Sequence, residues 1–420
     1  MNWKILNAWF YMARDIDKKN RITIIGGGPA GVMCAIEAAK NPNNDVTIVE
    51  QREILTTILP TGGGRCNLAH NEFNPVKLAG YFPRGEKFLY SIFTKFGTKE
   101  TLDFFHQIGI KTKIQEDNRI FPISDSAKEV RNALLEQIKK NKIKQIKGRV
   151  YSVSKVGDSF ELDFRSTVLH NTNFLVVATG GKESGFRLAY DLGHKIISPR
   201  PSLCALKIKE TQFYELSGVS VQNLSAKVKF KNKIIHKLSG DMLFTHTSLS
   251  GPLILKISSL CALLDFNVEN PLFIDVNFVG MDTEKFKQVL KEELENNLKK
   301  DLINVCTKYI SKYLACKLLG IIGISPEIKC ADVSKIKLRM IADIFTNYTF
   351  TAVSRVTQGA MVTAGGLSLK EINPKNIESK LHKNLFFCGE VLDIDGLTGG
   401  FNLQNCWSTG FIVGEYLRNL

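Results

Sequence analysis

The sequence predicts an α/β fold with a discontinuous domain on a parallel sheet, an inserted β-rich domain and a small helical subdomain. Three observations predict it. A β-branched run, a glycine-rich turn and an alanine-rich stretch follow one another in residues 21–39. A second glycine-rich segment precedes the last apolar helical stretch, near residue 400. Between them, short β-like runs give way to helical periodicity. At 420 residues the chain also exceeds what one hydrophobic core usually organises, about 250–300 residues.

The first glycine-rich turn has the GxGxxG spacing of a dinucleotide-binding, Rossmann-type fingerprint. It follows the strand-like run RITII and opens the helical stretch VMCAIEAAK. The first glycine permits the tight turn, the second lets the backbone approach a pyrophosphate, and the third lets helix and strand pack closely. The phosphates would lie at the helix N-terminus, where N–H groups and the helix dipole favour negative charge. The predicted phosphate-binding residues are Gly26, Gly28, Pro29, Ala30 and Gly31.

A second predicted strand, DVTIVE, ends in Glu50, which lies 50 − 31 = 19 residues after the last glycine of the fingerprint. An acidic residue at this distance hydrogen-bonds the adenosine ribose hydroxyls in Rossmann folds. The alternative is a solvated strand end. We include the neighbouring Gln51 in the predicted site. A carboxylate here would repel a 2′-phosphate, so the sequence favours FAD or NAD over NADP as the bound nucleotide.

The segment TGGGRCN, residues 61–67, adds a loop that can lie against a phosphate or a planar ring. Gly63 and Gly64 are its candidate backbone contacts. Arg65 is a candidate to pair with a phosphate or with substrate. Cys66 is either a redox thiol or a small buried filler, and we favour the filler because no second cysteine lies beside it.

Two strand exits complete the predicted cofactor site. The run FLVVATGG ends in a Thr-Gly-Gly exit of the kind that passes close to a ligand. Near the C-terminus, LFFCGEVLDIDGLTGGFN leads into an apolar helix whose N–H groups would face the N1/C2 carbonyl edge of a flavin and stabilise its reduced anion. This segment selects FAD over NAD. The candidate backbone contacts in these two segments are Thr179, Gly180, Gly181, Gly389 and Gly400.

Together these motifs resemble the YhiN/BaiN-like bacterial flavoproteins, also described as aminoacetone-oxidase-family FAD-binding enzymes. The resemblance runs from Arg21 to Leu420 and also uses LFTHTSLSGP, residues 243–252. It implies a discontinuous Rossmann-type FAD domain, and it implies that Val150, in a strand RVYSV, contacts adenine through its backbone. The resemblance also implies that Gly64, Arg65 and Cys66 approach the flavin or the pyrophosphate. The residues that it implies contact the ribityl chain and the isoalloxazine ring are Glu390, Asp393, Gly400, Phe401 and Asn402. One departure is Asn405-Cys406, where relatives often carry two bulkier apolar residues.

The expected domains follow from the motifs, the periodicity and this resemblance. Residues 1–20 are expected to be an extension without a secretory signal, or an upstream segment of a chain whose translation starts at Met12; an interfacial helix carrying Trp3, Trp9 and Phe10 is the alternative. The remaining boundaries are residues 21–195 with 355–420 for the FAD domain, 196–282 with 346–354 for the β-rich substrate domain, and 283–345 for the helical subdomain.

Two residues of the middle region are candidates for catalysis. His246 lies in a polar loop before the stretch LILKISSLCALL, and a histidine can donate a proton near neutral pH. The alternative for this loop, which we favour, is a helix cap by Ser248 or Ser250. Arg355 is a candidate contact for an anionic substrate, against the alternative of a salt bridge that links domains.

Composition restricts the class of protein further. The 56 lysines and arginines against 41 acidic residues give a formal charge of +15, but these cations are dispersed, so nucleic-acid binding is expected to be unlikely. Nine scattered cysteines without a CxxC pair argue against zinc, against disulfides and for a reducing cytoplasm. No metal site is expected. No apolar run reaches 18 residues, so no membrane span is expected.

The sequence therefore predicts an FAD-dependent oxidoreductase that acts on a small molecule. Because no second strand-turn-helix fingerprint is present, NADH or NADPH would visit the flavin transiently. Resemblance to BaiN-like enzymes implies reduction of a carbon–carbon double bond. The alternatives are an amine oxidase that acts on an aminoacetone-like substrate with O₂, and a flavin-dependent protein that modifies RNA or binds nucleic acid. The substrate and the oligomeric state are left open.

Overall fold

The computed structural model describes residues 19–165, 170–360 and 362–420. The chain divides into two compact units, Met1–Arg200 with Val362–Leu420, and Pro201–Met361. Apart from Lys19 and Asn20, the expected N-terminal extension lies outside the described residues, as do Met12 and the helix proposed to carry Trp3, Trp9 and Phe10.

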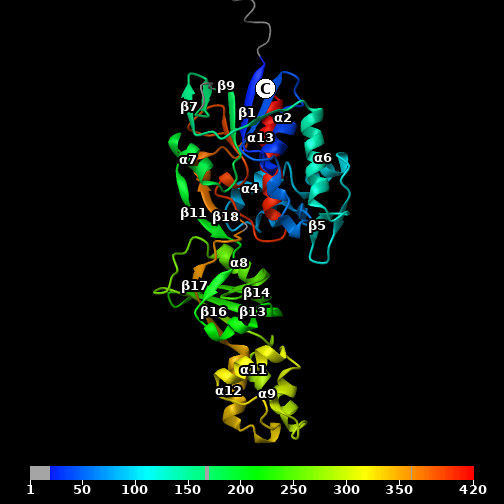
Figure 1. Cartoon of the computed structure of the whole chain (residues 1–420), viewed down its shortest axis with the longest axis vertical. Helices are drawn as coiled ribbons and strands as arrows, with labels where there is room; N and C mark the ends of the chain where they lie inside the picture. The colour runs from blue at the N-terminus through cyan, green and yellow to red at the C-terminus, as the bar shows by residue number, and fades with distance from the viewer. Residues whose placement is uncertain (1–18, 166–169, 361) are drawn as a thin grey trace, which may run out of the picture. The chain divides into compact units, whose positions relative to one another are not determined.

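The first unit is built on a five-stranded sheet in the order β19-β10-β1-β2-β6 (Figure 1). All four neighbouring pairs are parallel. The central strand β1 buries Ile22 and Ile24 completely, as expected for a parallel strand covered on both faces. The Rossmann-type α/β prediction is confirmed. The strands are β1 Asn20–Ile25, β2 Asn44–Glu50, β6 Lys144–Lys147, β10 Phe174–Val177 and β19 Leu385–Phe387.

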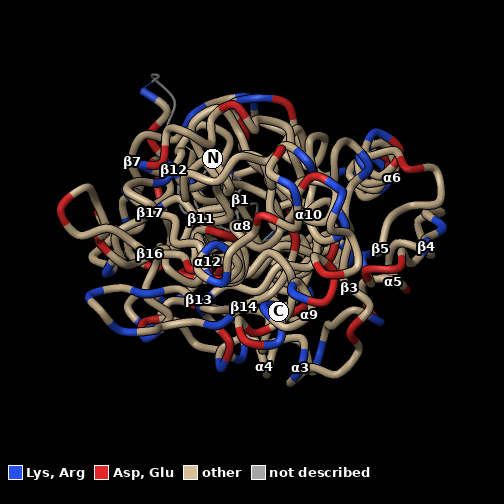
Figure 2. The backbone as a smooth tube through the Cα atoms, turned by 90° about the horizontal axis from the view of Figure 1, so that it is seen from below, with Lys and Arg blue, Asp and Glu red and all other residues tan. Residues whose placement is uncertain are grey.

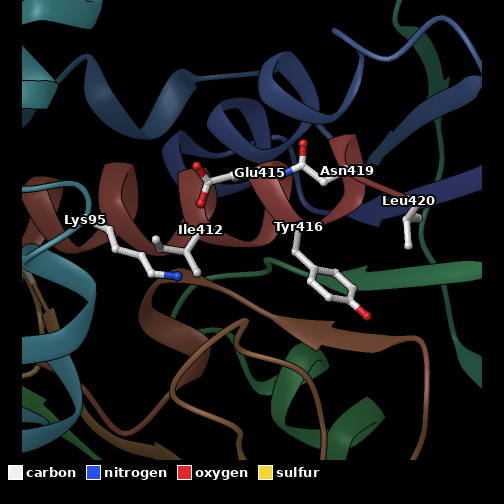
Figure 3. A pocket seen from close by; sticks show the side chains of 6 residues that line it. All are labelled: Lys95, Ile412, Glu415, Tyr416, Asn419 and Leu420. Atoms are coloured by element: carbon white, nitrogen blue, oxygen red, sulfur yellow. The ribbon is translucent and has the colours of Figure 1, made fainter.

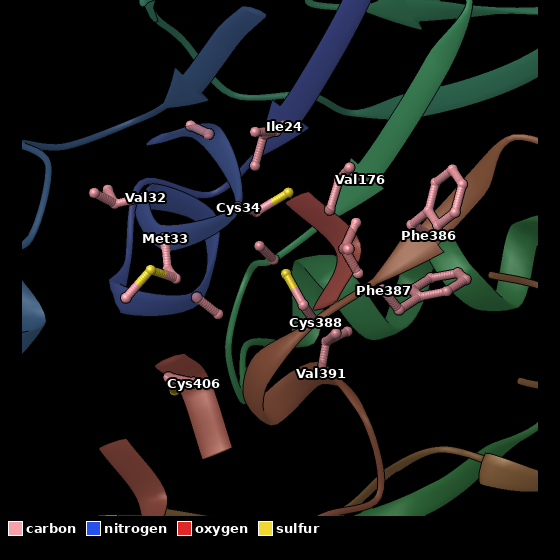
Figure 4. Close-up of a cluster of buried hydrophobic side chains, with 14 of the residues drawn as sticks. Ile24, Val32, Met33, Cys34, Val176, Phe386, Phe387, Cys388, Val391 and Cys406 are labelled. Carbon is pink, nitrogen blue, oxygen red and sulfur yellow. The ribbon is translucent and has the colours of Figure 1, made fainter. Parts of the chain in front are cut away.

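Two helices that are far apart in sequence, α2 (Pro29–Ala38) and α13 (Phe401–Arg418), lie side by side in this unit (Figure 1). All nine residues of α2 after Pro29, Ala30 to Ala38, are buried, so this helix is covered on all sides. Figure 4 shows side chains of α2, β10 and β19 meeting in the shared core, among them Cys34, Val176 and Phe387.

The remaining elements of the first unit surround this core. Its other helices are α3 Pro75–Ala79, α4 Glu86–Phe93, α5 Thr98–Gln107, α6 Ala127–Lys140 and α7 Glu183–Asp191. Its other strands are β3 Ala69–His70, β4 Thr112–Ile114, β5 Arg119–Pro122, β7 Ser152–Val156, β8 Ser159–Asp163, β9 His170–Thr172, β11 Ile196–Ser202 and β18 Val362–Leu367. Short 3₁₀ turns occur at Thr56–Ile58, Thr61–Gly63, Leu369–Glu371 and Gly389–Val391.

The second unit contains a closed six-stranded barrel in the order β12-β15-β14-β13-β16-β17. Its strands are β12 Leu206–Ile208, β13 Ser220–Phe230, β14 Lys233–Phe244, β15 Ser248–Ser250, β16 Leu272–Asn277 and β17 Tyr348–Arg355. Alternation along β13 buries Leu224, Ala226 and Val228 while the residues between them face outward. The antiparallel sheet or barrel expected in this region is therefore present.

The helices of the second unit pack on a core of their own, separate from that of the first unit. They are α8 Pro252–Leu260, α9 Thr283–Glu295, α10 Leu302–Cys306, α11 Lys312–Ile321 and α12 Lys335–Thr346, with 3₁₀ turns at Thr211–Leu216 and Cys330–Asp332. The helical periodicity read from residue 282 onward thus corresponds to α9 to α12.

Two local predictions are wrong. Ser248 and Ser250 do not cap α8: they lie in strand β15, and the residue before the helix is Gly251, with φ 89° and no side-chain cap. A would-be Cβ at Gly251 would meet Leu243 N at 2.9 Å, so this tight strand-to-helix turn requires glycine. Val150 was expected in a strand, but it precedes β7, which begins only at Ser152.

Candidate functional site

The carboxyl ends of β1, β2, β10 and β19 share one edge of the parallel sheet. Chain order places β2 on one side of β1 and β10 on the other, so the strand order reverses between β1 and β10. In open α/β sheets, ligands bind in the crevice outside such a switch point. The predicted cofactor residues that follow these four strands, Gly26, Glu50, Thr179 and Gly389, therefore come together at this edge.

The glycine fingerprint fills the tight turn between β1 and α2. Gly26 has φ 113°, and a Cβ there would lie 2.3 Å from Ala178 O after β10. A Cβ at Gly31 would lie 2.0 Å from Gly26 O. In contrast, Gly28 has room, because its would-be Cβ meets only Thr57 Oγ1 at 3.8 Å. Gly28 precedes α2 without a side-chain cap, and Pro29 is the first helical residue, so the first turn can receive an anion.

Glu50 is held in a fixed position at the end of β2. Its Oε2 accepts a hydrogen bond from Gly27 N at 2.8 Å, and its Oε1 accepts one from Arg52 N at 2.9 Å. The next residue, Gln51, is exposed. The carboxylate is therefore presented beside the fingerprint, where the predicted ribose contact requires it.

The N-terminus of α13 resembles that of α2, because it also follows a glycine and has no side-chain cap. Gly400 has φ 99°, and a Cβ there would lie 2.4 Å from Ala69 O. The amide of Asn67 accepts from Gly400 N at 2.9 Å and donates to Ala69 O at 3.1 Å. No side chain caps α13. Its first turn is thus held against the segment after the TGGGRC loop, with backbone N–H groups available to a ligand.

The side chains of Phe401 and Asn402 are occupied within the protein. Phe401 is buried and stacks on Tyr81, with 4.3 Å between ring centroids. Asn402 accepts from Gly396 N at 2.8 Å and donates to Gly396 O at 2.9 Å. Both side chains therefore hold the loop in front of α13, and any contact of these two residues with a cofactor would come from their backbone.

Glycines in α13 set the spacing between the two helix N-termini. A Cβ at Gly410 would lie 2.3 Å from Ala30 O, and one at Gly414 would lie 2.7 Å from Cys34 O. The two helices therefore run in the same direction. Gly410 lies 410 − 401 = 9 residues into α13, and Ala30 lies 30 − 29 = 1 residue into α2. The two N-termini are therefore offset by 9 − 1 = 8 residues, or about 12 Å along the axis at 1.5 Å per residue. An extended dinucleotide can use both ends at once.

Buried polar groups without partners lie at the same edge of the sheet. Thr179 Oγ1 and Asp393 Oδ1 are enclosed and have no hydrogen-bond partner within the described part of the chain. Burial raises the pKa of Asp393, while Arg84 acts against that rise. Burial raises the pKa of Glu390 to about 7, opposed by a hydrogen bond from the Gly181 backbone. Buried acids without enough donors fit a ligand rich in hydroxyl groups, such as the ribityl chain of FAD.

The loop of residues 61–67 gives Arg65 a defined position. Its guanidinium lies 4.2 Å above the Phe121 ring, and its Nε donates to Gly62 O at 3.1 Å. We find no other hydrogen bond of Arg65 in residues 19–165, 170–360 and 362–420. A Cβ at Gly63 would meet nothing within 4 Å, and one at Gly64 only Leu59 O at 4.0 Å. This loop therefore offers a fixed cation beside open backbone.

Cys66 lies in the same loop but is fully buried, and burial raises the pKa of its thiol to about 12. A thiol in this state stays protonated near neutral pH and is a poor nucleophile. The packing role that we favoured from the sequence accounts for it.

The two candidates of the middle region belong to the second unit. His246 is exposed in the turn between β14 and β15. Arg355, at the end of β17, donates from Nη2 to Cys261 O and Leu264 O, both at 2.7 Å, and lies 4.3 Å above the Phe266 ring. All these partners belong to the second unit, so the contacts hold the Arg355 side chain within that unit.

Sequence reasoning missed three supports of the site. No role in the site was predicted for Asn67, although a short polar residue directly after TGGGRC was a local signal for one. Arg84 forms a buried ion pair with Asp395, and no local pattern pointed to Arg84. Thr363 packs against Gly181, because a Cβ added to Gly181 would lie only 2.4 Å from Thr363 Oγ1. Each support depends on contacts between segments far apart in sequence.

A pocket of about 310 Å³ lies at the other end of α13, lined by Lys95, Ile412, Glu415, Tyr416, Asn419 and Leu420 (Figure 3). Because α13 begins at Phe401, this pocket is separate from the site at the helix N-terminus. No group of three or more His, Cys, Asp or Glu side chains suited to a metal ion occurs in the described residues. No helix among them is both long and apolar enough to cross a membrane.

Comparison with known proteins identifies close similarities over nearly the whole chain. Residues 20–416 match the family described as HI0933-like protein Rossmann domain. A 3-dehydro-bile acid delta(4,6)-reductase of Clostridium scindens is 29% identical, over 94% of this chain and 98% of its own. Ribosomal RNA dihydrouridine synthases of Haemophilus influenzae and Escherichia coli are 28% and 25% identical, over 92% and 94% of this chain and 96% and 97% of theirs.

Proposed function

Because the chain belongs to the HI0933-like family of Rossmann-domain proteins and is an FAD-dependent oxidoreductase, we propose that it reduces a carbon–carbon double bond conjugated to a carbonyl group. NADH or NADPH is the proposed reductant. The relatives support this reaction because a delta(4,6)-reductase of a 3-oxo steroid and a dihydrouridine synthase both add two hydrogens across such a bond. The substrate class is therefore an activated alkene.

The observation that carries the cofactor site is the pair of parallel, uncapped helix N-termini at the switch point of the sheet. We propose that Gly28, Ala30 and Gly31 at the start of α2 bind the pyrophosphate and that Glu50 binds the adenosine ribose. Asp393 and Glu390 would accept hydrogen bonds from the ribityl hydroxyls. The N-terminus of α13 would face the pyrimidine edge of the ring, where its dipole favours negative charge.

The chemistry that FAD supplies when bound is two-electron transfer, from the nicotinamide and then to the alkene. Reduction of a conjugated alkene places a hydride on one carbon and a proton on its neighbour, and negative charge develops on the carbonyl oxygen. Arg65, fixed by Phe121 and Gly62 O, is our candidate for stabilising that oxygen. His246 and Arg355 stay candidates for proton donation and for binding an anionic group of the substrate.

Anaerobic rapid mixing of the FAD-loaded protein with NADH, NADPH or aminoacetone tests the proposal. We expect bleaching of the flavin band by NADH or NADPH and its return when a conjugated enone is added. Absence of bleaching by both nucleotides would rule out the reductase. Bleaching by aminoacetone, followed by reoxidation with O₂, would instead support the amine oxidase alternative.

A second candidate substrate is uridine within ribosomal RNA. The formal charge of +15 favours it, and two of the relatives are named for this reaction. Uracil is itself an alkene conjugated to a carbonyl, so the proposed chemistry is unchanged. Mass spectrometry of ribosomal RNA after incubation with protein and NADPH should detect a gain of two hydrogens per modified uridine. RNA that stays unmodified while a small enone is reduced would exclude this candidate.

A further inference from the structure

A lysine-rich hairpin distinguishes the barrel of the second unit. Between Glu215 and Asp241 the sequence has five lysines and no acidic residue. The lysines lie along the hairpin formed by β13 and β14, and Figure 2 shows these strands with blue stretches. Four are exposed and Lys229 is half-buried. They are Lys227, Lys229, Lys231, Lys233 and Lys237.

The register of the hairpin places three of these lysines, Lys227, Lys229 and Lys237, on one outer face, whereas Lys233 pairs with Phe230 near the tip. Lys227 of β13 lies directly opposite Lys237 of β14. Lys229 forms an ion pair with Asp275 of β16, and Asp275 also accepts a hydrogen bond from Thr349 at 2.8 Å. Like charges directly opposite one another destabilise a sheet. The Lys227–Lys237 pair therefore opposes folding unless an anion binds to it.

The tip of the hairpin adds apolar side chains to this charge. Lys231 and Asn232 have φ 48° and 62°, the conformation of a tight two-residue turn. Pairing of β13 with β16 ends at Lys229, so the tip extends beyond that ladder. Phe230 is half-buried beneath Lys231, whose Nζ lies 5.6 Å from the ring centroid, and Ile234 is exposed. A cationic ribbon with an aromatic ring is suited to phosphates and stacked bases.

The usual structural reason for surface lysines accounts for only part of this face. Lysines can prevent an exposed strand segment from pairing with another chain, which explains Lys233 and Lys237, because β14 pairs with β15 only at Leu243 and Phe244. However, β13 is paired on both sides, with β14 and with β16. Prevention of edge pairing therefore does not explain Lys227 and Lys229. Elsewhere in this unit lysines have acidic partners, such as Lys287–Glu284 and Lys308–Glu293.

We propose that the outer face of the β13–β14 hairpin is the surface on which this protein docks the phosphate backbone of a structured RNA. The inference rests on the second candidate substrate, uridine in RNA, and adds the surface that would hold that RNA. Same-face residues along a strand are about 7 Å apart, a spacing comparable with that of successive phosphates in a nucleic-acid strand. The charge complementarity and the unfavourable lysine pair both favour a polyanion over a neutral partner.

The test compares two variants of the FAD-loaded full chain that lose the same charge. The hairpin variant is K227Q/K231Q/K237Q, and the control is K287Q/K291Q/K308Q in the helical segment. Affinity for a transcribed ribosomal RNA fragment is measured as a function of salt. We expect the hairpin variant to bind at least tenfold more weakly and to lose about 2–3 from the salt slope, since each lost phosphate contact removes about 0.7–0.9. The control should stay within twofold of wild type.

Other outcomes overturn the inference. Equal losses in both variants would mean that only net charge matters, and unchanged affinity of the hairpin variant would place the RNA elsewhere. A hairpin variant that loses binding to phosphatidylserine vesicles but not to RNA would make the face a lipid site. Wild type that fails to bind RNA at low salt would remove both the docking surface and the RNA candidate. Flavin bleaching by NAD(P)H and enone reduction are followed in parallel, so the proposed reductase stands or falls independently.

Discussion

At the residue scale, Gly410 controls the contact between α2 and α13, because a Cβ there would lie 2.3 Å from the backbone oxygen of Ala30. Backbone cannot yield as a flexible side chain can. We therefore expect Gly410→Ala to lower the free energy of unfolding by about 1–3 kcal/mol and to weaken FAD binding by moving the two helix N-termini. Urea unfolding and FAD content of the purified variant measure both effects.

Gly320→Ala is the matched control, because Gly320 lies in α11, is exposed and has nothing within 4 Å of its would-be Cβ. Alanine is the better helix former, so this change should stabilise the protein by up to about 1 kcal/mol. If Gly410→Ala behaves like the control, the close contact between the helices is not required.

The buried carboxyl of Glu390 predicts a pH dependence of stability in the protein stripped of FAD. Its pKa is raised to about 7, so between about pH 4.5 and 7 the unfolded chain has released this proton while the folded chain keeps it. Stability contributed by this group falls as the pH rises through that window, by at most about 3 kcal/mol, and less to the extent that solvent screens the partly exposed side chain.

Glu390→Gln should remove this fall, so the variant should gain stability relative to wild type at pH 8 but not at pH 4.5. Chemical unfolding at the two pH values measures the difference. Glu136→Gln, on the exposed surface of α6, controls for the loss of one carboxylate. Identical pH profiles for wild type and Glu390→Gln would contradict the prediction.

At the element scale, the loop between β19 and α13 is fixed by the amide of Asn402, which bonds both the N–H and the C=O of buried Gly396. Asn402→Ala leaves two buried backbone groups without partners, and each costs about 1–3 kcal/mol. We expect lower stability and a tenfold or greater rise in the FAD dissociation constant, measured by flavin fluorescence.

Asn402→Asp gives an intermediate test, because a carboxylate still accepts from Gly396 N but cannot donate to Gly396 O. It should fall between wild type and Asn402→Ala. Asn132→Ala, at an exposed position of α6, should leave FAD affinity unchanged. An affinity of Asn402→Ala equal to that of wild type would show that the loop keeps its conformation without this amide.

The elements also show which parts of the fold a sequence can predict. Strand β1 was predicted to within one residue and α2 to within three, because periodicity and glycine spacing are local signals. The cap of α8 was wrong because strand pairing of Ser248 with Lys207 overrode a local capping signal. Phe401 and Asn402 were predicted as site residues by motif, but their side-chain contacts with Tyr81 and Gly396 depend on tertiary packing that no local pattern shows.

At the scale of the whole molecule, the chain holds two hydrophobic cores, one in each unit. The second unit is continuous from Pro201 to Met361, whereas the first is assembled from both ends of the chain. A separate core in a continuous segment predicts independent folding. We therefore expect residues 201–361, expressed alone, to unfold cooperatively.

Calorimetry of the full chain connects this organisation to the cofactor. All residues of the proposed FAD site lie in the first unit, so FAD should raise only one of two unfolding transitions. Ligand at 100 times its dissociation constant adds about 2.7 kcal/mol to the unit that binds it. The other transition should have the same midpoint temperature as the excised segment 201–361, and FAD should not shift it. A single transition that moves as a whole with FAD would mean that the two units unfold together, because binding to one unit would then stabilise the entire chain.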